Sequence, residues 1–163
     1  MKLKTGLKTT TVLQVNSVIK MKNILFVCTG NTCRSPMAEA LFNHIYGSDD
    51  IKASSRGIYA DGISQISKNA KQALWEKGID FNHTSKPLLL EDISNADYVV
   101  GITANHAKNI ISLFPDFADK VFAMPIDISD PYGQDIDVYR ECRDQIELCV
   151  KIIAEALNGE GND

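Results

Sequence analysis

A short apolar run leads directly into a loop that ends in Arg-Ser-Pro, and this junction restricts the fold more than any other feature of the chain. The run Asn23–Val27 predicts a buried strand, and residues Pro36–Tyr46 have the pattern of a helix. Cys28 ends the strand, at the edge where ligands bind in open α/β sheets. The Gly-containing loop can turn its backbone N–H groups inward, and the helix directs its positive end at the same point. We therefore expect an oxyanion-binding strand–loop–helix unit with a cysteine at its base.

The loop residues have the chemistry of a phosphate site that contains a nucleophile. Gly30 and Asn31 tolerate the positive φ that such a loop requires. Arg34 can bind two phosphate oxygens in a bidentate fork, and Ser35 is placed to cap the helix and to donate a hydrogen bond to the Cys28 sulfur. The N–H groups, the helix dipole and the guanidinium should lower the pKa of Cys28 from about 8.5 to roughly 4–7. This arrangement suits covalent phosphoryl transfer through a phosphocysteine.

Two simpler interpretations of these cysteines are weaker. A single cysteine at the end of a strand is commonly a small buried apolar residue, but this one is followed by Arg34 and a helix. Cys28 and Cys33 could be zinc ligands, but their separation of five residues does not fit a zinc knuckle, and no second Cys/His pair at finger spacing follows. The pattern therefore favours catalysis.

Phosphoryl transfer to water also requires a proton donor for the leaving group and a base for the attacking water. Asp130 is the candidate, because Pro131 and Gly133 place it in a surface turn that can lean over the pocket. An Asp before Pro is more often only a turn residue, and Asp127 is the nearest competitor for the role. Tyr132 would then form an aromatic wall of the cleft.

The loop motif, extended as C-T-G-N-T-C-R-S-P-M-A-E-A, resembles the low-molecular-weight protein tyrosine phosphatase family, and the likeness runs from Met21 to Leu157. The resemblance implies that Cys28 is the nucleophile, Arg34 the phosphate clamp and Asp130 the general acid. It also implies that one loop asparagine fixes the loop geometry and that the serine after the arginine is the partner of the thiolate. The phosphate-binding loop then consists of Thr29, Gly30, Asn31, Thr32, Cys33 and Ser35.

Thr32 bears on the identity of the substrate. Tyrosine phosphatases of this family commonly have Ile or Leu at this pocket-facing position, whereas Thr resembles the protein arginine phosphatase subgroup, as does the stretch Asp130–Tyr139. A hydroxyl can meet a polar guanidinium, and Gly133 weakens a wall that would grip a phenol. Tyr132 departs from the Phe of that subgroup, so protein phosphotyrosine stays the alternative substrate. The alternative interpretation is that Thr32 is a neutral substitution that does not affect the choice of substrate.

Two other functions fit the loop less well. Thioredoxin-coupled arsenate reductases have a similar loop but need two further cysteines near the strand Tyr98–Ile102, where this chain has none. Cys142 and Cys149 are seven residues apart, which on a helix is about 10.5 Å along the axis and beyond the reach of a disulfide. An inactive phosphate-binding module is disfavoured because nucleophile, clamp and acid are all present.

Apolar periodicity predicts strands that alternate with helices. The expected strands are Asn23–Val27, Ile51–Tyr59, Tyr98–Ile102 and Lys120–Met124, and the expected helices are Pro36–Tyr46, Ser67–Lys77, Leu88–Asn95, Asn105–Phe114 and Asp135–Leu157. This order predicts an α/β fold, a single domain with a four-stranded parallel sheet and helices on both faces. We expect the phosphatase domain to span residues 21–158, with residues 1–20 as a disordered or non-native extension and residues 159–163 as a tail.

Composition sets the remaining limits. Of the 163 residues, 44% are hydrophobic and 23% are charged, which is typical of a soluble globular domain. The net charge of −4 gives no electrostatic footprint for nucleic acid, and no segment approaches the length of a transmembrane helix. Four cysteines without a disulfide framework indicate a reducing cytoplasm. We expect a phosphorylated protein as substrate, no cofactor, no metal, no nucleic-acid or membrane partner, and a monomer.

The three histidines and the single tryptophan are predicted to have structural roles. His83 is interpreted as a hydrogen-bonded scaffold residue near the loop. His44 and His106 are expected on helix surfaces, and Trp75 in the core. None of the four is expected to take part in the reaction.

Overall fold

The computed structural model describes residues 21–160, which form one sheet of four parallel strands in the order β2-β1-β3-β4. The strands are β1 (Lys22–Cys28), β2 (Ile51–Gly57), β3 (Tyr98–Gly101) and β4 (Val121–Ala123). Because every neighbouring pair is parallel, all four strands end at the same edge of the sheet. The predicted extension of residues 1–20 lies outside the described residues.

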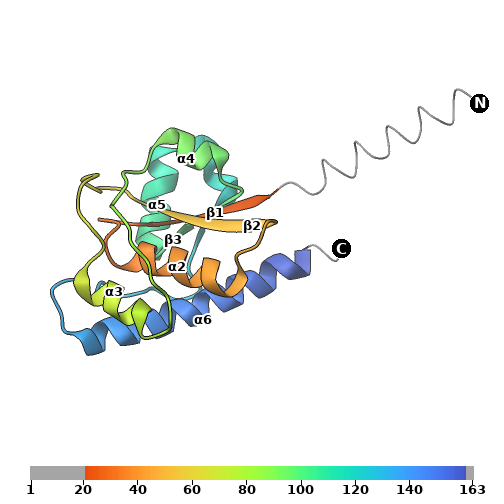
Figure 1. Ribbon diagram of the computed structural model, residues 1–163. Helices are drawn as coiled ribbons and strands as arrows, with labels where there is room; N and C mark the ends of the chain where they lie inside the picture. The colour runs from red at the N-terminus through yellow and green to blue at the C-terminus, as the bar shows by residue number, and fades with distance from the viewer. Residues whose placement is uncertain (1–20, 161–163) are drawn as a thin grey trace, which may run out of the picture.

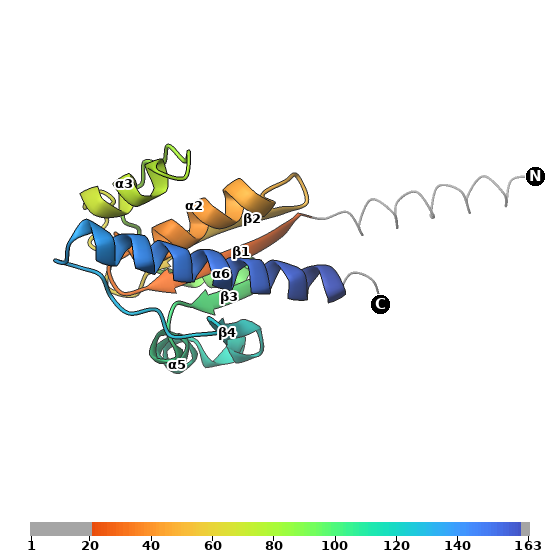
Figure 2. The same cartoon turned by 90° about the horizontal axis from the view of Figure 1, so that it is seen from below.

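Helices cover both faces of the sheet, which confirms the expected fold. They are α2 (Arg34–Tyr46), α3 (Lys68–Trp75), α4 (Leu90–Asn95), α5 (Ala104–Leu113), the 3-10 helix η1 (Pro115–Lys120) and α6 (Ile136–Glu160). Figure 1 shows α4 and α5 on one side of the strands and α2, α3 and α6 on the other. Figure 2, from below, shows α6 running beneath the sheet beside α2. No helix within residues 21–160 has the length and apolar character needed to cross a membrane.

The central strand β1 supplies a core to each face because its side chains alternate in direction. Ile24 and Phe26 pack into the larger core under α2, α3 and α6, and Cys28 points to that same side. Leu25 and Val27 pack into the smaller core under α4 and α5. All five side chains are at most 3% exposed, so β1 has the continuous apolar pattern of a parallel strand covered on both faces.

The end of β2 lies directly against the loop that follows β1. Gly57 pairs with Cys28 in the sheet register, and its N–H and C=O also bond to the segment Lys86–Leu88. A Cβ atom at Gly57 would lie 2.6 Å from the Thr29 carbonyl oxygen and 2.9 Å from the Asn31 Cβ. A residue without a side chain is therefore required for β2 to support the loop so closely.

The structure corrects several predicted boundaries. Helix α6 continues to Glu160, beyond the predicted end of this helix at Leu157. The first two residues of the predicted tail, 159 and 160, therefore belong to the helix. Helix α3 ends at Trp75, before the predicted end, because the chain turns at Gly78 with φ of +77°. Trp75 is 59% exposed, so its predicted place in the core is wrong. The 3-10 helix η1 was not predicted, because its sequence has no apolar periodicity.

Candidate active site

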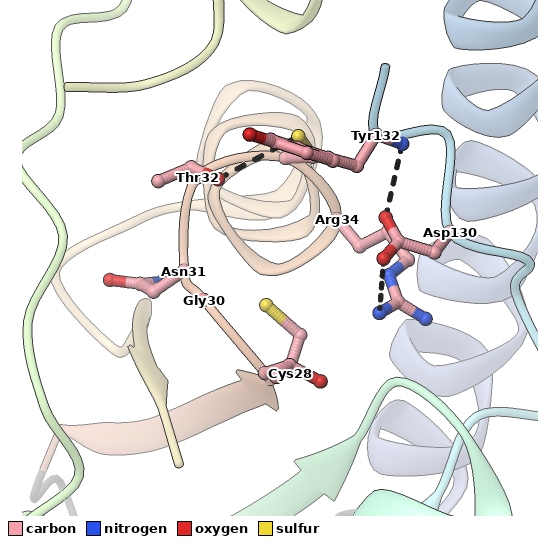
Figure 3. Close-up of a pocket in the computed structure, with 9 residues that line it drawn as sticks. Cys28, Gly30, Asn31, Thr32, Arg34, Asp130 and Tyr132 are labelled. Carbon is pink, nitrogen blue, oxygen red and sulfur yellow. Dashed lines mark hydrogen bonds and ion pairs between the residues drawn. The ribbon is translucent and has the colours of Figure 1, made fainter. Parts of the chain in front are cut away.

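All of the predicted site residues except Ser35 line one pocket of about 210 Å³ at the edge of the sheet where the parallel strands end. The lining residues are Cys28, Thr29, Gly30, Asn31, Thr32, Cys33, Arg34, Asp130 and Tyr132. Figure 3 shows the Cys28 sulfur pointing into the curve of the loop, with Arg34 and Asp130 together on one side. The fold thus brings the loop after β1 next to Asp130 and Tyr132, which lie about a hundred positions later in the chain.

The side chain of Asn31 holds the loop in shape. Its backbone has φ of 58°, the left-handed conformation that asparagine tolerates, whereas Gly30 does not take the positive φ expected of it. The Asn31 amide nitrogen donates to the Ser35 hydroxyl at 2.8 Å and to the Ser55 hydroxyl at 3.0 Å. Its oxygen accepts from His83 Nε2 at 2.7 Å and from the Lys86 N–H at 2.9 Å. The fully buried amide thus has a partner at each of its four sites.

Ser35 faces the cysteine, but it is not the cap of the helix. Helix α2 already includes Arg34, its capping position is Cys33, and the Cys33 side chain makes no capping hydrogen bond. The predicted capping role of Ser35 is therefore wrong. Its hydroxyl lies 2.8 Å from the Cys28 sulfur and accepts a hydrogen from Asn31. The Ser35 O–H has two acceptors within reach, the Cys28 sulfur at 2.8 Å and the Arg56 carbonyl oxygen at 3.4 Å, and a thiolate at Cys28 would be the nearer and the charged one.

Opposing influences set the pKa of Cys28. Burial raises it above its ordinary value and is the largest influence, since the side chain is only 3% exposed. The Ser35 hydroxyl, the backbone N–H groups of Ser35 and Asn31, and the charge of Arg34 all lower it. The net direction is upward, so the predicted lowering of this pKa is wrong. Desolvation of a buried thiolate outweighs the hydrogen bonds that the loop supplies.

Arg34 connects the loop to the segment that carries Asp130. Its side chain is almost buried and donates from Nη1 to the carbonyl oxygen of Ile128 at 2.9 Å. Its Nη2 lies 3.7 Å from Asp130 Oδ2, whereas the Asp130 side chain is 57% exposed. The Tyr132 N–H donates to Asp130 Oδ1 at 3.1 Å and orients the carboxylate. The competitor Asp127 instead accepts from an N–H at the start of α5 and does not line the pocket.

Two exposed aromatic residues frame a second hollow beside the pocket. This groove of about 380 Å³ shares Thr32 and Tyr132 with the pocket and is also lined by Tyr59 and Asp61. In Figure 3 the Tyr132 side chain extends from the Asp130 segment across the loop toward Thr32. Tyr132 is 74% exposed, so its ring forms a rim of the pocket rather than a part of the core. There is therefore room beside the loop for a residue that belongs to a larger substrate.

Comparison with known proteins agrees with this geometry. The family described as "Low molecular weight phosphotyrosine protein phosphatase" matches residues 23–162. The chain belongs to this family. The protein-arginine-phosphatase of Bacillus subtilis is 40% identical over 83% of this chain and 96% of its own length. Arsenate reductase 1 of Bacillus cereus is 36% identical over 82% of this chain and 95% of its own length.

A solved structure also resembles this phosphatase closely. It is a YwlE arginine phosphatase mutant described as having a phosphorylated active-site serine in place of cysteine. Its TM-score is 0.80 at 39% identity, and the match covers 83% of this chain and 95% of that chain. The fold and the pocket are therefore those of a cysteine-based phosphatase family.

Buried groups behind the loop extend the phosphatase site beyond what the sequence indicated. His83 is the scaffold residue expected, because it bonds Asn31 and stacks on Phe81. Glu39 lies 3.8 Å from the other ring nitrogen of His83, and its burial raises the pKa of this carboxyl to about 7. His106, predicted on a helix surface, is only 7% exposed and bonds to Thr29. The T-x-x-H spacing from Thr103, which forms a capping box, was the sequence signal for His106.

Within residues 21–160, no group of three His, Cys, Asp or Glu side chains is arranged to hold a metal ion. The polar side chains that line the pocket include the Arg34 guanidinium, the Asp130 carboxylate and the hydroxyls of Thr29 and Thr32. A guanidinium recognises an oxyanion directly.

Removing the Ser35 hydroxyl should raise the pKa of Cys28 still further, because that hydroxyl is the largest of the influences that lower it. In S35A, the rate of Cys28 alkylation by iodoacetamide should reach its midpoint at a higher pH than in the wild type. Mass mapping of the modified cysteine against pH measures this shift. S112A, an exposed exchange on α5, is the matched control and should leave the midpoint unchanged. An equal midpoint in S35A and the wild type would contradict the contact.

Proposed function

We propose that this phosphatase hydrolyses phosphoarginine in proteins through a phosphocysteine formed on Cys28. The observation that carries the proposal is the shared pocket, because a single cavity is lined by Cys28, Arg34, Asp130 and Thr32. The name of the Bacillus subtilis relative supports the substrate. The phosphorylated active-site serine of the YwlE mutant supports a covalent phosphoryl group on the nucleophile.

In the first step, the Cys28 thiolate attacks phosphorus and the bond between phosphorus and the guanidine nitrogen breaks. The departing nitrogen takes a proton from Asp130, which stands at the open side of the pocket. The loop N–H groups and Arg34 hold the phosphoryl oxygens, where negative charge is greatest in the transition state. The guanidinium of Arg34 is fixed in advance by its bond to the Ile128 carbonyl, so little reorganisation accompanies the reaction.

In the second step, water attacks the phosphocysteine and the sulfur–phosphorus bond breaks. Asp130, now a carboxylate, accepts the proton of this water, and inorganic phosphate is released. The leaving sulfur becomes a thiolate again. Ser35, 2.8 Å from that sulfur, donates a hydrogen bond to it as the charge returns. One serine contact thus assists the sulfur both as nucleophile and as leaving group.

Thr32 supports phosphoarginine as the substrate. Its hydroxyl has only a weak contact, at 3.8 Å, with the Cys33 sulfur, so it remains available to accept a hydrogen from a guanidinium N–H. A branched apolar residue at the same position would instead pack against a phenyl ring. Protein phosphotyrosine is the second candidate, because Tyr132 and Tyr59 give aromatic surface beside the pocket.

Arsenate reduction fits less well, although an arsenate reductase is among the relatives. The four cysteines of the chain are free, and Cys142 and Cys149 are both buried on the continuous helix α6. Their separation along the helix, about 10.5 Å for seven residues, prevents a disulfide. Free cysteines and a reactive thiolate also favour a reducing cytoplasm as the location.

The decisive experiment measures release of phosphate from a phosphoarginine peptide by the wild type and by C28S. Loss of the nucleophile should lower kcat by at least about 10⁴-fold, as for other covalent catalysts. C149S makes the same exchange on α6, outside the pocket, and should keep the activity. Full activity in C28S would refute the covalent mechanism.

Replacing Asp130 by Asn should lower kcat by about 10²- to 10⁴-fold, because the amide cannot protonate the leaving nitrogen or accept a proton from water. Single-turnover and steady-state measurements on a phosphoarginine peptide test this. D127N is the control: Asn keeps an acceptor for the N–H of Ala104, so kcat should hardly change. If D127N lost as much activity as D130N, the assignment of the acid would be wrong.

Substitution of Thr32 should change the preference between substrates. In T32I, the ratio of kcat/KM for phosphoarginine to that for phosphotyrosine peptides should fall, by up to about 200-fold if only packing changes. T32V, which keeps the shape but removes the hydroxyl, separates hydrogen bonding from bulk, and T32S keeps the hydroxyl. An unchanged ratio in both T32I and T32V would reject a role for Thr32 in specificity.

A further inference from the structure

His106 lies behind Thr29, outside the set of residues that line the pocket, and is held on both sides of its ring. Its side chain is only 7% exposed. Nε2 lies 2.9 Å from the Thr29 hydroxyl, and Nδ1 lies 3.2 Å from the backbone N–H of Thr103. Thr29 lines the pocket. The imidazole therefore connects the first turn of α5 to a residue that faces the substrate.

These contacts fix the tautomer of the ring. The Thr103 N–H can only donate, so Nδ1 of His106 must be an acceptor, and the Thr103 hydroxyl, 3.0 Å from the same nitrogen, then also donates to it. Burial, and then the nearby charge of Arg34, lower the pKa of His106 to about 4, so the ring is neutral near pH 7. A neutral imidazole with an accepting Nδ1 carries its hydrogen on Nε2. The Nε2–H group therefore donates to the Thr29 hydroxyl oxygen.

Close packing and capping hydrogen bonds hold the start of α5, and with it the His106 ring, in place. A Cβ atom at Gly101, the last residue of β3, would lie 2.5 Å from the backbone nitrogen of Ala107, so helix and strand approach very closely. Thr103 caps the helix by accepting from the His106 N–H. The N–H of Ala104, the first residue of α5, donates to Asp127 Oδ1 at 2.9 Å.

We propose that His106 is a positioning residue that fixes the Thr29 hydroxyl as a hydrogen-bond donor to the phosphoryl oxygens of the substrate. The role rests on the proposed phosphatase function. Because the Thr29 oxygen accepts from His106, its own hydrogen is left for the pocket that it lines. Within residues 21–160, His106 is the only hydrogen-bond partner of that hydroxyl.

The chemistry of the substrate identifies the group that this donor meets. A guanidinium has only donors, whereas each phosphoryl oxygen accepts. A donor in the pocket therefore binds the phosphoryl end, with either phosphoarginine or phosphotyrosine as the substrate. Thr29 thus adds one side-chain donor to the backbone N–H groups and Arg34.

The test compares T29V, H106L and the double variant. T29V should weaken binding of inorganic phosphate, measured by calorimetry and as a competitive inhibition constant, by about 10- to 100-fold, the usual effect of one hydrogen bond to a charged acceptor. H106L should weaken it in the wild type but have no further effect in the T29V background. T29S, which keeps the hydroxyl, and H106Q, whose amide can donate, should bind phosphate more tightly than T29V and H106L.

Two results would overturn the role. One is phosphate binding by T29V equal to that of the wild type, and the other is the same loss from H106L in both backgrounds. H44L makes the matched exchange at an exposed position of α2 and should change nothing. Should H106L fail to fold, as judged by circular dichroism, T29V alone decides, because Thr29 is exposed and outside both cores. Absence of phosphoarginine and phosphotyrosine hydrolysis by the wild type would refute the phosphatase proposal separately, because phosphate binding is measured without turnover.

Discussion

The hydrogen bonds of one buried amide, that of Asn31, hold the pocket together. Its left-handed backbone reverses the chain after Cys28, and its side chain binds the start of α2, the end of β2 and the segment around His83. Replacing this amide would destabilise the fold, because each lost hydrogen bond leaves a buried polar group unsatisfied. Each such group costs about 1–3 kcal/mol of folding free energy. The loop is thus shaped by side chains behind it before any anion enters.

This rigidity bears directly on the electrostatics of Cys28. Burial in the loop raises the pKa of the thiol, and the groups that lower it are the same Ser35 hydroxyl, backbone N–H groups and Arg34 that would bind an oxyanion. The donors therefore offset part of the effect of burial and stabilise the thiolate. Arg34 is fixed by the Ile128 carbonyl, so its charge acts on both the sulfur and Asp130. A pocket with fewer of these donors would make the thiolate still rarer.

The sequence predicted those parts of the site that depend on local chain geometry. The strand–loop–helix unit follows from hydrophobic periodicity, and the left-handed Asn31 follows from the short list of residues that tolerate positive φ. His106 and Trp75 were mispredicted because their burial depends on how closely a helix approaches its neighbours, which periodicity does not encode. The pKa of Cys28 was mispredicted for a related reason. It is a balance of large opposing effects, and a sequence gives their signs but not their sizes.

In the proposed mechanism, the two threonines of the loop separate affinity from specificity. Phosphoarginine and phosphotyrosine share a phosphoryl group, so a donor at Thr29 would stabilise both substrates and would not distinguish them. They differ at the leaving group, where a guanidinium offers donors and a phenol offers an aromatic face. An acceptor near the rim, where Thr32 lies beside Tyr132, can detect that difference. Because an unpaired polar group discriminates far more strongly than a change of one methyl, we propose that selection of phosphoarginine depends on the polarity of Thr32 rather than on its size.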